Sequence, residues 1–118
     1  MAPKADTVHM FDDPTTALYS TPTDDPERLE AISDFVIALA ARVDRLQDAQ
    51  VVADYGQLGS LCRSLESNAA NLGYPRLADI AREVAVACSL EKEESIELGI
   101  LAITDIARRV RQGHRGAV

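Results

Sequence analysis

Two thiols and two imidazoles are the side chains of this sequence best suited to nucleophilic, redox or metal chemistry. The thiols belong to Cys62 and Cys88, and the imidazoles belong to His9 and His114. Neither cysteine forms a CxxC pair or a Cys/His spacing typical of zinc sites. His114 has no second ligand or carboxylate at helical spacing, and His9 lies in a stretch without sustained helical periodicity. We therefore expect no metal site and no cofactor, reduced cysteines that fill a core, and solvated histidines in terminal tails.

Carboxylates and hydroxyls offer a second possible chemistry, hydrolysis. Asp54, Asp79, Glu83 and several serines could in principle supply such a site. The sequence has no Ser/His/Asp set and no glycine-rich phosphate loop, and no acids are visibly paired in an apolar pocket. We therefore expect no catalytic residues and predict that the chain is not an enzyme.

Charge limits the classes of partner. The formal net charge is -7, and nucleic-acid binding requires clustered cations. A cluster does occur at Arg108, Arg109, Arg111 and Arg115, and we interpret it as a helix C-terminus whose cations complement the helix dipole. No apolar stretch is long enough to span a membrane, and the first residues lack a signal-peptide pattern. We expect a cytoplasmic protein that binds neither nucleic acid nor membrane.

Length and composition favour one helical domain. The chain has 118 residues, 47% of them hydrophobic, but only 4% are aromatic and none is tryptophan. A core of Leu, Ile, Val and Ala suits packed helices. We predict an N-terminal arm over residues 1–23, a helical bundle over 24–112 and a C-terminal tail over 113–118. The apolar pairs Met10-Phe11 and Leu18-Tyr19 could dock the arm onto the bundle.

Local signals divide the bundle into helices. Asp24 or Asp25 is the expected N-cap of the first helix, with Pro26 in its first position. A second helix begins near Asp54 and ends at Gly73, because glycine readily adopts the left-handed conformation that closes a helix. Pro75 then starts a third helix that ends near Ser89. A fourth helix opens with Glu91, Glu93 and Glu94, and it closes in arginines.

Each predicted helix carries an apolar stripe at alternating steps of three and four residues. The stripes are Leu29, Ile32, Val36, Leu39, Val43 and Leu46, broadened by Phe35 and Ala40; Val51, Tyr55, Leu58, Cys62, Leu65, Ala69 and Leu72; Leu77, Ile80, Val84 and Ala87, with Ala81 and Cys88 alongside; and Ile96, Ile100, Ile103, Ala107 and Val110. Four amphipathic helices with short connections predict an all-α, antiparallel up-down four-helix bundle.

The run from Leu58 to Pro75, LGSLCRSLESNAANLGYP, resembles the signature helix of histidine-containing phosphotransfer (HPt) domains. That signature reads roughly L-x-x-x-x-H-x-L-K-G-S-A-x-x-x-G-x-P, and the likeness extends over most of residues 24–112. Aligning Gly73 with the glycine of the signature puts Arg63 at the phosphorylated histidine. Glu66 then stands at the usual lysine and Ser67 at the usual glycine.

These three replacements alter the chemistry that the resemblance would otherwise imply. A histidine offers a neutral imidazole nitrogen to a phosphoryl group, whereas a protonated arginine has no such lone pair. Glu66 adds negative charge, and Ser67 adds bulk. The resemblance therefore implies a signalling module of a bacterial two-component phosphorelay that binds a response-regulator receiver domain or a histidine kinase without carrying phosphohistidine. Its implied partner-binding face is formed by Gly59, Arg63, Glu66, Ser67 and Ala70.

Other interpretations remain open at the level of the sequence. Arg63 could be an ordinary solvent-facing residue that pairs with Glu66 at i+3. The bundle could also be a structural or regulatory protein that self-associates, with Gly59 and Ala69-Ala70 permitting close helix approach, or that binds an unrelated partner. We expect the chain to be a monomer or a weak homodimer. An active phosphotransferase is less favoured, because residues 24–112 contain no histidine.

Overall fold

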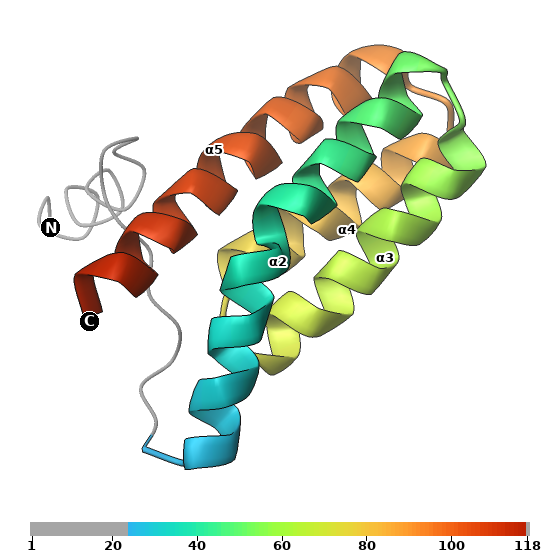
Figure 1. Cartoon of the computed structure of the whole chain (residues 1–118). Coiled ribbons are helices and arrows are strands. Elements are labelled where there is room, and N and C mark those ends of the chain that lie inside the picture. Colours follow the sequence, from blue (N-terminus) through green and yellow to red (C-terminus); the bar gives the residue numbers. More distant parts are fainter. Residues whose placement is uncertain (1–23, 118) are drawn as a thin grey trace, which may run out of the picture.

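A computed structural model describes residues 24–117, with side chains described for residues 24–114. Within that part the chain forms four helices, α2 (Pro26–Val51), α3 (Tyr55–Asn71), α4 (Pro75–Ser89) and α5 (Glu93–Ala117). Each packs against the next, and α2 also packs against α5, which closes the bundle (Figure 1). The predicted all-α four-helix bundle is confirmed. The expected arm, with its apolar pairs and His9, lies outside the described residues.

Helices α2, α3 and α4 begin where the sequence predicts, whereas α5 begins at Glu93, so that Glu91, which was expected to open it, lies in the preceding connection. The Asp25 carboxylate accepts a hydrogen bond of 3.1 Å from the Glu27 N–H, and Pro26 is the first residue of α2. The Asp54 carboxylate caps α3 in the same way, accepting a bond of 3.1 Å from the Gln57 N–H. These oxygens satisfy backbone donors that have no partner within the helix.

The three connections between helices, residues 52–54, 72–74 and 90–92, share one backbone design. The middle residue of each has a positive φ, at 57° for Ala53, 87° for Gly73 and 53° for Glu91. In the first connection the N–H of residue 53 donates to the carbonyl of Gln50 at 3.0 Å, and the N–H of residue 54 donates to that of Ala49 at 2.9 Å. This is the Schellman arrangement, and the other two connections repeat it. The predicted role of Gly73 is confirmed.

Replacing Ala53 with glycine is expected to raise the free energy of unfolding by about 1 kcal/mol. An L-residue at positive φ is strained by roughly that amount, and glycine is not. Urea denaturation followed by circular dichroism measures the change. The matched control is Gly73→Ala, which should lower stability by a similar amount because it introduces the same strain. A loss of stability in Ala53→Gly would show that the Ala53 methyl makes a compensating contact.

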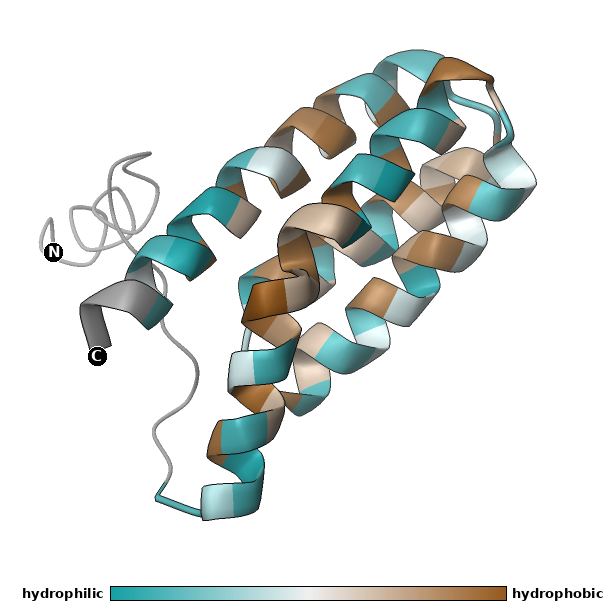
Figure 2. Cartoon of the chain, viewed as in Figure 1, coloured by the Kyte–Doolittle hydropathy of each residue, from teal (hydrophilic) through white to brown (hydrophobic). Residues whose placement is uncertain are grey.

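The predicted apolar stripes meet in one core, and hydrophobic and hydrophilic bands alternate along each helix (Figure 2). The stripe residues that are buried as predicted are Ile32, Phe35, Val36, Leu39, Val43, Leu46, Leu58, Cys62, Leu65, Ala69, Leu77, Ala81, Val84, Ala87, Cys88, Ile96, Ile100, Ile103, Ala107 and Val110. Tyr55, Leu72 and Ile80 are partly buried against this core.

Three stripe assignments were wrong. Leu29 is half exposed, because the 26-residue α2 begins well beyond the end of the 17-residue α3 and its first turns are covered less. Val51 is exposed because it is the last residue of α2, at the edge of the bundle. Ala40 is exposed because its position, one residue after the fully buried Leu39, turns it towards solvent.

The predicted C-terminal tail is also wrong over most of its length. Helix α5 continues past residue 112 as far as Ala117, and it includes Gly113 and His114. Glycine ends a helix when it takes a positive φ, and among the described glycines Gly73 does so. Gly113 instead stays helical and is buried, and His114 is half-buried rather than solvated.

Candidate functional site

Helix α3 presents the residue that the sequence singles out. Arg63 lies near the middle of α3 and is exposed. Ser60, Ser67 and Ala70 are exposed too, and spacings of three and four residues place them beside Arg63 on one side of the helix. We call Ser60, Arg63, Ser67 and Ala70 the Arg63 surface.

Gly59 does not belong to this surface, although the sequence analysis placed it there. It is buried where α3 packs against α4. A Cβ atom at this position would lie 3.5 Å from the Cβ of Cys88 and 4.0 Å from the carbonyl oxygen of Ala85. Gly59 is buried because it lies one residue from Leu58 and three residues from Cys62, both of which are fully buried.

A shallow groove of about 510 Å³ runs beside Arg63 between α3 and α4. Its α3 side is formed by Tyr55, Gly56, Gly59, Ser60 and Arg63, and its other side by Ala85, Cys88 and Ser89 of α4 with Glu91 of the connection to α5. Sequence reasoning missed Ser60 and Tyr55 as members of this site. The spacing of three residues between Ser60 and Arg63 was a usable signal, whereas the approach of α4 was not visible in the sequence.

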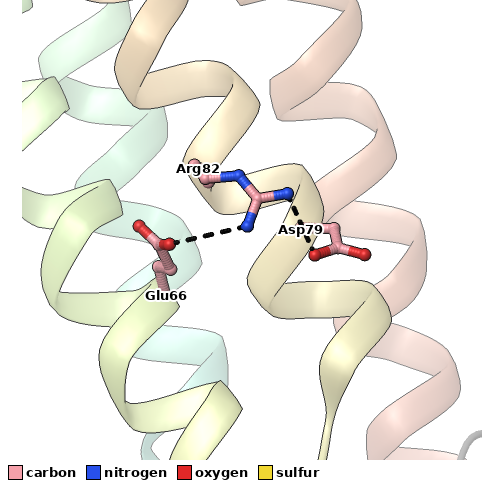
Figure 3. A network of polar contacts seen from close by, with 3 residues as sticks. All are labelled: Glu66, Asp79 and Arg82. Atoms are coloured by element: carbon pink, nitrogen blue, oxygen red, sulfur yellow. Dashed lines mark hydrogen bonds and ion pairs between the residues drawn. The ribbon is translucent and has the colours of Figure 1, made fainter.

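Glu66 pairs with α4 and not with Arg63. Its Oε2 lies 3.9 Å from Nη1 of Arg82, whose Nη2 donates to Oδ1 of Asp79 at 3.2 Å (Figure 3). These side chains are partly exposed, so the pairs add little to stability. The suggested Arg63–Glu66 pair is therefore wrong. Among the described residues, Arg63 forms no ion pair.

Cys62 and Cys88 are free thiols within the core, as predicted. Burial, together with the neighbouring Cys88, raises the pKa of Cys62 to about 12. Burial also raises the pKa of Cys88, while the charge of Arg63 lowers it in part. Thiolates are the reactive form of cysteine, so Cys62 is held in its unreactive form at neutral pH.

Alkylation should report this protection directly. At pH 8, iodoacetamide is expected to modify Cys62 at least about tenfold more slowly in the folded chain than in urea, because reaction requires opening of the core. Intact-mass spectrometry of a Cys88→Ala variant isolates the Cys62 thiol. Folding raises the pKa of Cys62 from about 9 to about 12, so the folded state favours the protonated thiol. The stabilisation that comes from this protonated thiol is complete below pH 9, and it is lost as the pH rises towards 12. Equal rates of alkylation in the folded chain and in urea would contradict the burial of Cys62.

Two of the four C-terminal arginines, Arg108 and Arg109, differ from the expected dipole cluster. Arg108 is exposed, and its Nη2 donates to Oδ1 of Asp105 at 2.7 Å. Arg109 is only 2% exposed, and its Nη1 lies 3.6 Å from Oδ2 of Asp105. Because α5 continues to Ala117, both arginines precede the last turn, where a cation interacts with the dipole. Arg109 is therefore a buried residue of the core and does not complement the dipole at the end of the helix.

The described part of the chain holds neither a cluster of metal ligands nor a membrane-spanning helix. No group of three or more His, Cys, Asp or Glu side chains there could hold a metal ion. None of its helices combines the length and apolarity needed to cross a membrane. Comparisons with family models, with curated proteins and with solved structures find no match to this chain.

Proposed function

We propose that this chain is an HPt-like interaction module of a two-component phosphorelay. It binds a receiver domain or a histidine kinase through the Arg63 surface and does not carry phosphohistidine itself. The observation that supports this proposal is the state of Arg63. The residue aligned with the phosphorylated histidine is exposed in the middle of α3 and has no ion pair with any described residue.

The chemistry of the site supports binding without transfer. Arginine stays protonated throughout the physiological range and offers no lone pair to a phosphoryl group. Glu66, at the position of the usual lysine, directs its carboxylate towards Arg82 on α4 (Figure 3). Residues 24–112 contain no imidazole, and His114, which α5 includes, is half-buried and lies on a different helix from Arg63. A phosphoryl group at Arg63 would therefore meet no nucleophile, and Glu66 supplies a negative charge where the family has the cation of a lysine.

The same features favour recognition of an acidic partner surface. A guanidinium that forms no internal ion pair can bind a carboxylate through two parallel hydrogen bonds. Ser67 and Ala70 have short side chains, which leave the guanidinium accessible. Arginines at the centre of an interface often carry a large part of the binding energy. Arg63 is accordingly the residue whose loss should weaken binding most.

The experiment combines phosphotransfer with direct binding. The chain is incubated with autophosphorylated histidine kinases and receiver domains from its own organism, and each is also tested by surface plasmon resonance. We expect no acid-labile phosphate on the chain. We also expect at least one receiver or kinase to bind, and Arg63→Glu to weaken that binding by about tenfold or more.

Arg76→Glu is the matched control, because it makes the same charge reversal at an exposed position in the first turn of α4. The helix dipole favours a glutamate in the first turn of a helix. Binding that falls equally in both variants would indicate a non-specific charge effect and would contradict the proposal. Acid-labile phosphate on the chain would contradict it as well.

Self-association is a second candidate, but on a different face from the one first considered. Ala69 and Gly59, which were expected to permit close approach of a second copy, are buried within the bundle. Large apolar side chains are instead exposed on α4 and α5, at Val86, Leu98 and Leu101. Light scattering over a range of concentrations tests this candidate. A monomer at every concentration would exclude it.

A further inference from the structure

A second groove, of about 400 Å³, lies between α2 and α3. Its lining residues are Ala38, Arg42, Arg45 and Leu46 from α2, and Leu61, Ser64, Leu65 and Asn68 from α3. None of them belongs to the Arg63 surface, because they lie on the side of α3 that faces α2. Leu46 and Leu65 are each 1% exposed and form an apolar floor. The groove thus combines a hydrophobic base with a polar rim.

Two arginines stand together on that rim. Arg42 and Arg45 are three residues apart on α2, which places them on the same side of the helix. Among the described residues neither forms an ion pair with a carboxylate. Other arginines of this acidic chain do, including Arg82, Arg108 and Arg109. The groove therefore holds two adjacent arginines, neither within ion-pair distance of a described carboxylate.

Arg42 is held in place before any ligand arrives. Its Nη2 donates to the hydroxyl oxygen of Ser64 at 3.1 Å, and its guanidinium carbon lies 5.8 Å from the centroid of the Phe35 ring. The cation–π contact and the hydrogen bond restrict the position of the guanidinium. A side chain that is already ordered loses less conformational entropy when a ligand binds.

The two charges also act on each other. Burial lowers the pKa of Arg42, and the charge of Arg45 lowers it further. Both effects disfavour the cationic form of Arg42, although an arginine remains protonated at physiological pH. An anion placed between the two guanidinium groups would offset the repulsion between them. Oxyanions are the ligands that paired guanidinium groups bind best, through short charge-assisted hydrogen bonds.

We propose that the groove between α2 and α3 binds an oxyanion carried by a small apolar group, as in a carboxylate or a phosphate monoester. Arg42 and Arg45 hold the charged oxygens. The amide of Asn68 and the hydroxyl of Ser64 supply further donors at the rim. The apolar part of the ligand lies on Leu61 and on the floor of the groove. This binding site is independent of the proposed function, with which it shares no residue.

Titrations of the full-length chain, followed by calorimetry and by ¹H–¹⁵N spectra, test the proposal. The compounds are phenyl phosphate, benzoate, inorganic phosphate and the neutral benzyl alcohol. Saturable binding of phenyl phosphate or benzoate is expected, with a Kd on the order of 1 mM or below. Phenyl phosphate should bind about tenfold more tightly than inorganic phosphate because of the apolar floor. Benzyl alcohol should not bind, since the charge anchors the ligand.

The comparison of phenyl phosphate with benzoate identifies which of the two oxyanions the groove takes. Arg45→Gln and Arg42→Gln should each weaken binding by about fivefold or more. Arg45 is exposed, so its variant tests the proposal even if Arg42→Gln disturbs folding. Arg82→Gln makes the same change of charge on α4 and should bind as the unchanged chain does.

Three results would overturn the proposal. The first is that neither aromatic anion binds saturably. The second is that Arg82→Gln weakens binding as much as Arg45→Gln does. The third is that the spectral changes lie at the Arg63 surface instead of at Ser64 and Asn68. The first of these results would leave receiver or kinase binding untouched. Failure of the groove and failure of the proposed function are therefore distinguishable.

Discussion

Replacing Arg109 with alanine is expected to lower the free energy of unfolding by about 3 kcal/mol, whereas replacing it with methionine should lower it by less than about 1 kcal/mol. Arg109 is 2% exposed and is among the largest fully buried side chains of the bundle. Alanine would leave a cavity where the long side chain now packs. Methionine would fill most of that volume and would remove a buried charge together with its desolvation penalty.

The ion pairs of Asp105 make this comparison possible. Asp105 lies 3.6 Å from Arg109 and 2.7 Å from Arg108, so it keeps a partner when Arg109 is replaced. Urea denaturation followed by circular dichroism measures each variant. Arg108→Ala is the control, because it removes an exposed pair worth less than about 1 kcal/mol. A methionine variant as unstable as the alanine variant would mean that the guanidinium contributes through its polar contacts and not through packing.

Replacing Gly99 with alanine is expected to lower the free energy of unfolding by about 2 kcal/mol, even though alanine is the better helix former. Gly99 lies where α5 packs on α4. A Cβ atom there would overlap Cγ2 of Val84. Val84 is 1% exposed and β-branched, so it has no alternative rotamer into which it can move easily. The overlap must therefore separate the two helices or strain one of them.

Two further variants isolate the steric origin of this loss. Gly56→Ala is the matched control, because the nearest atom to its new methyl is a carboxylate oxygen of Asp54 at 3.8 Å. It should gain up to about 1 kcal/mol from helix propensity alone. In the double variant Gly99→Ala with Val84→Ala, the two changes should be strongly non-additive, since the second removes the atom that clashes. Additive losses in a double-mutant cycle, measured by urea denaturation, would contradict a clash between these residues.

The helix boundaries show what the sequence could predict. Asp25 with Pro26, and Gly73 with Pro75, are local signals whose meaning depends on the backbone alone, and the structure confirms them. Ala53 occupies the same kind of turn as Gly73 with no glycine to mark it. That turn is imposed by the packing of the helices on either side. Local composition could not reveal it, because the strain is offset by contacts made elsewhere.

The side chains also divide into those whose environment the local sequence predicts and those whose environment depends on packing between helices. On the face that the resemblance implied, Arg63, Ser67 and Ala70 are exposed as expected, whereas Gly59 is buried. Arg109 was misread because its charge was given more weight than its position three residues after the buried Ile106. The partner of Glu66 lies on another helix, which periodicity within one helix cannot identify.

The arginine groove was also missed, although the sequence contains a partial signal for it. Arg42 has no acidic residue three or four positions away in either direction, and Arg45 has one, Asp48, three positions further on. That pattern indicates that Arg42 has no carboxylate partner on its own helix. The convergence of the two arginines with Ser64 and Asn68 depends on how α3 packs against α2, and the structure was needed to find it.

The most direct test of the account is a spectroscopic map of the binding surface. The ¹⁵N-labelled chain is titrated with the receiver domain or kinase that binds it most tightly, and ¹H–¹⁵N spectra are recorded. We expect the largest changes at Ser60, Arg63, Ser67 and Ala70, with the exposed residues of α2 and α5 unaffected. Largest changes at the apolar residues Leu98 and Leu101, or none at saturation, would contradict the claim that the Arg63 surface of α3 is the binding site.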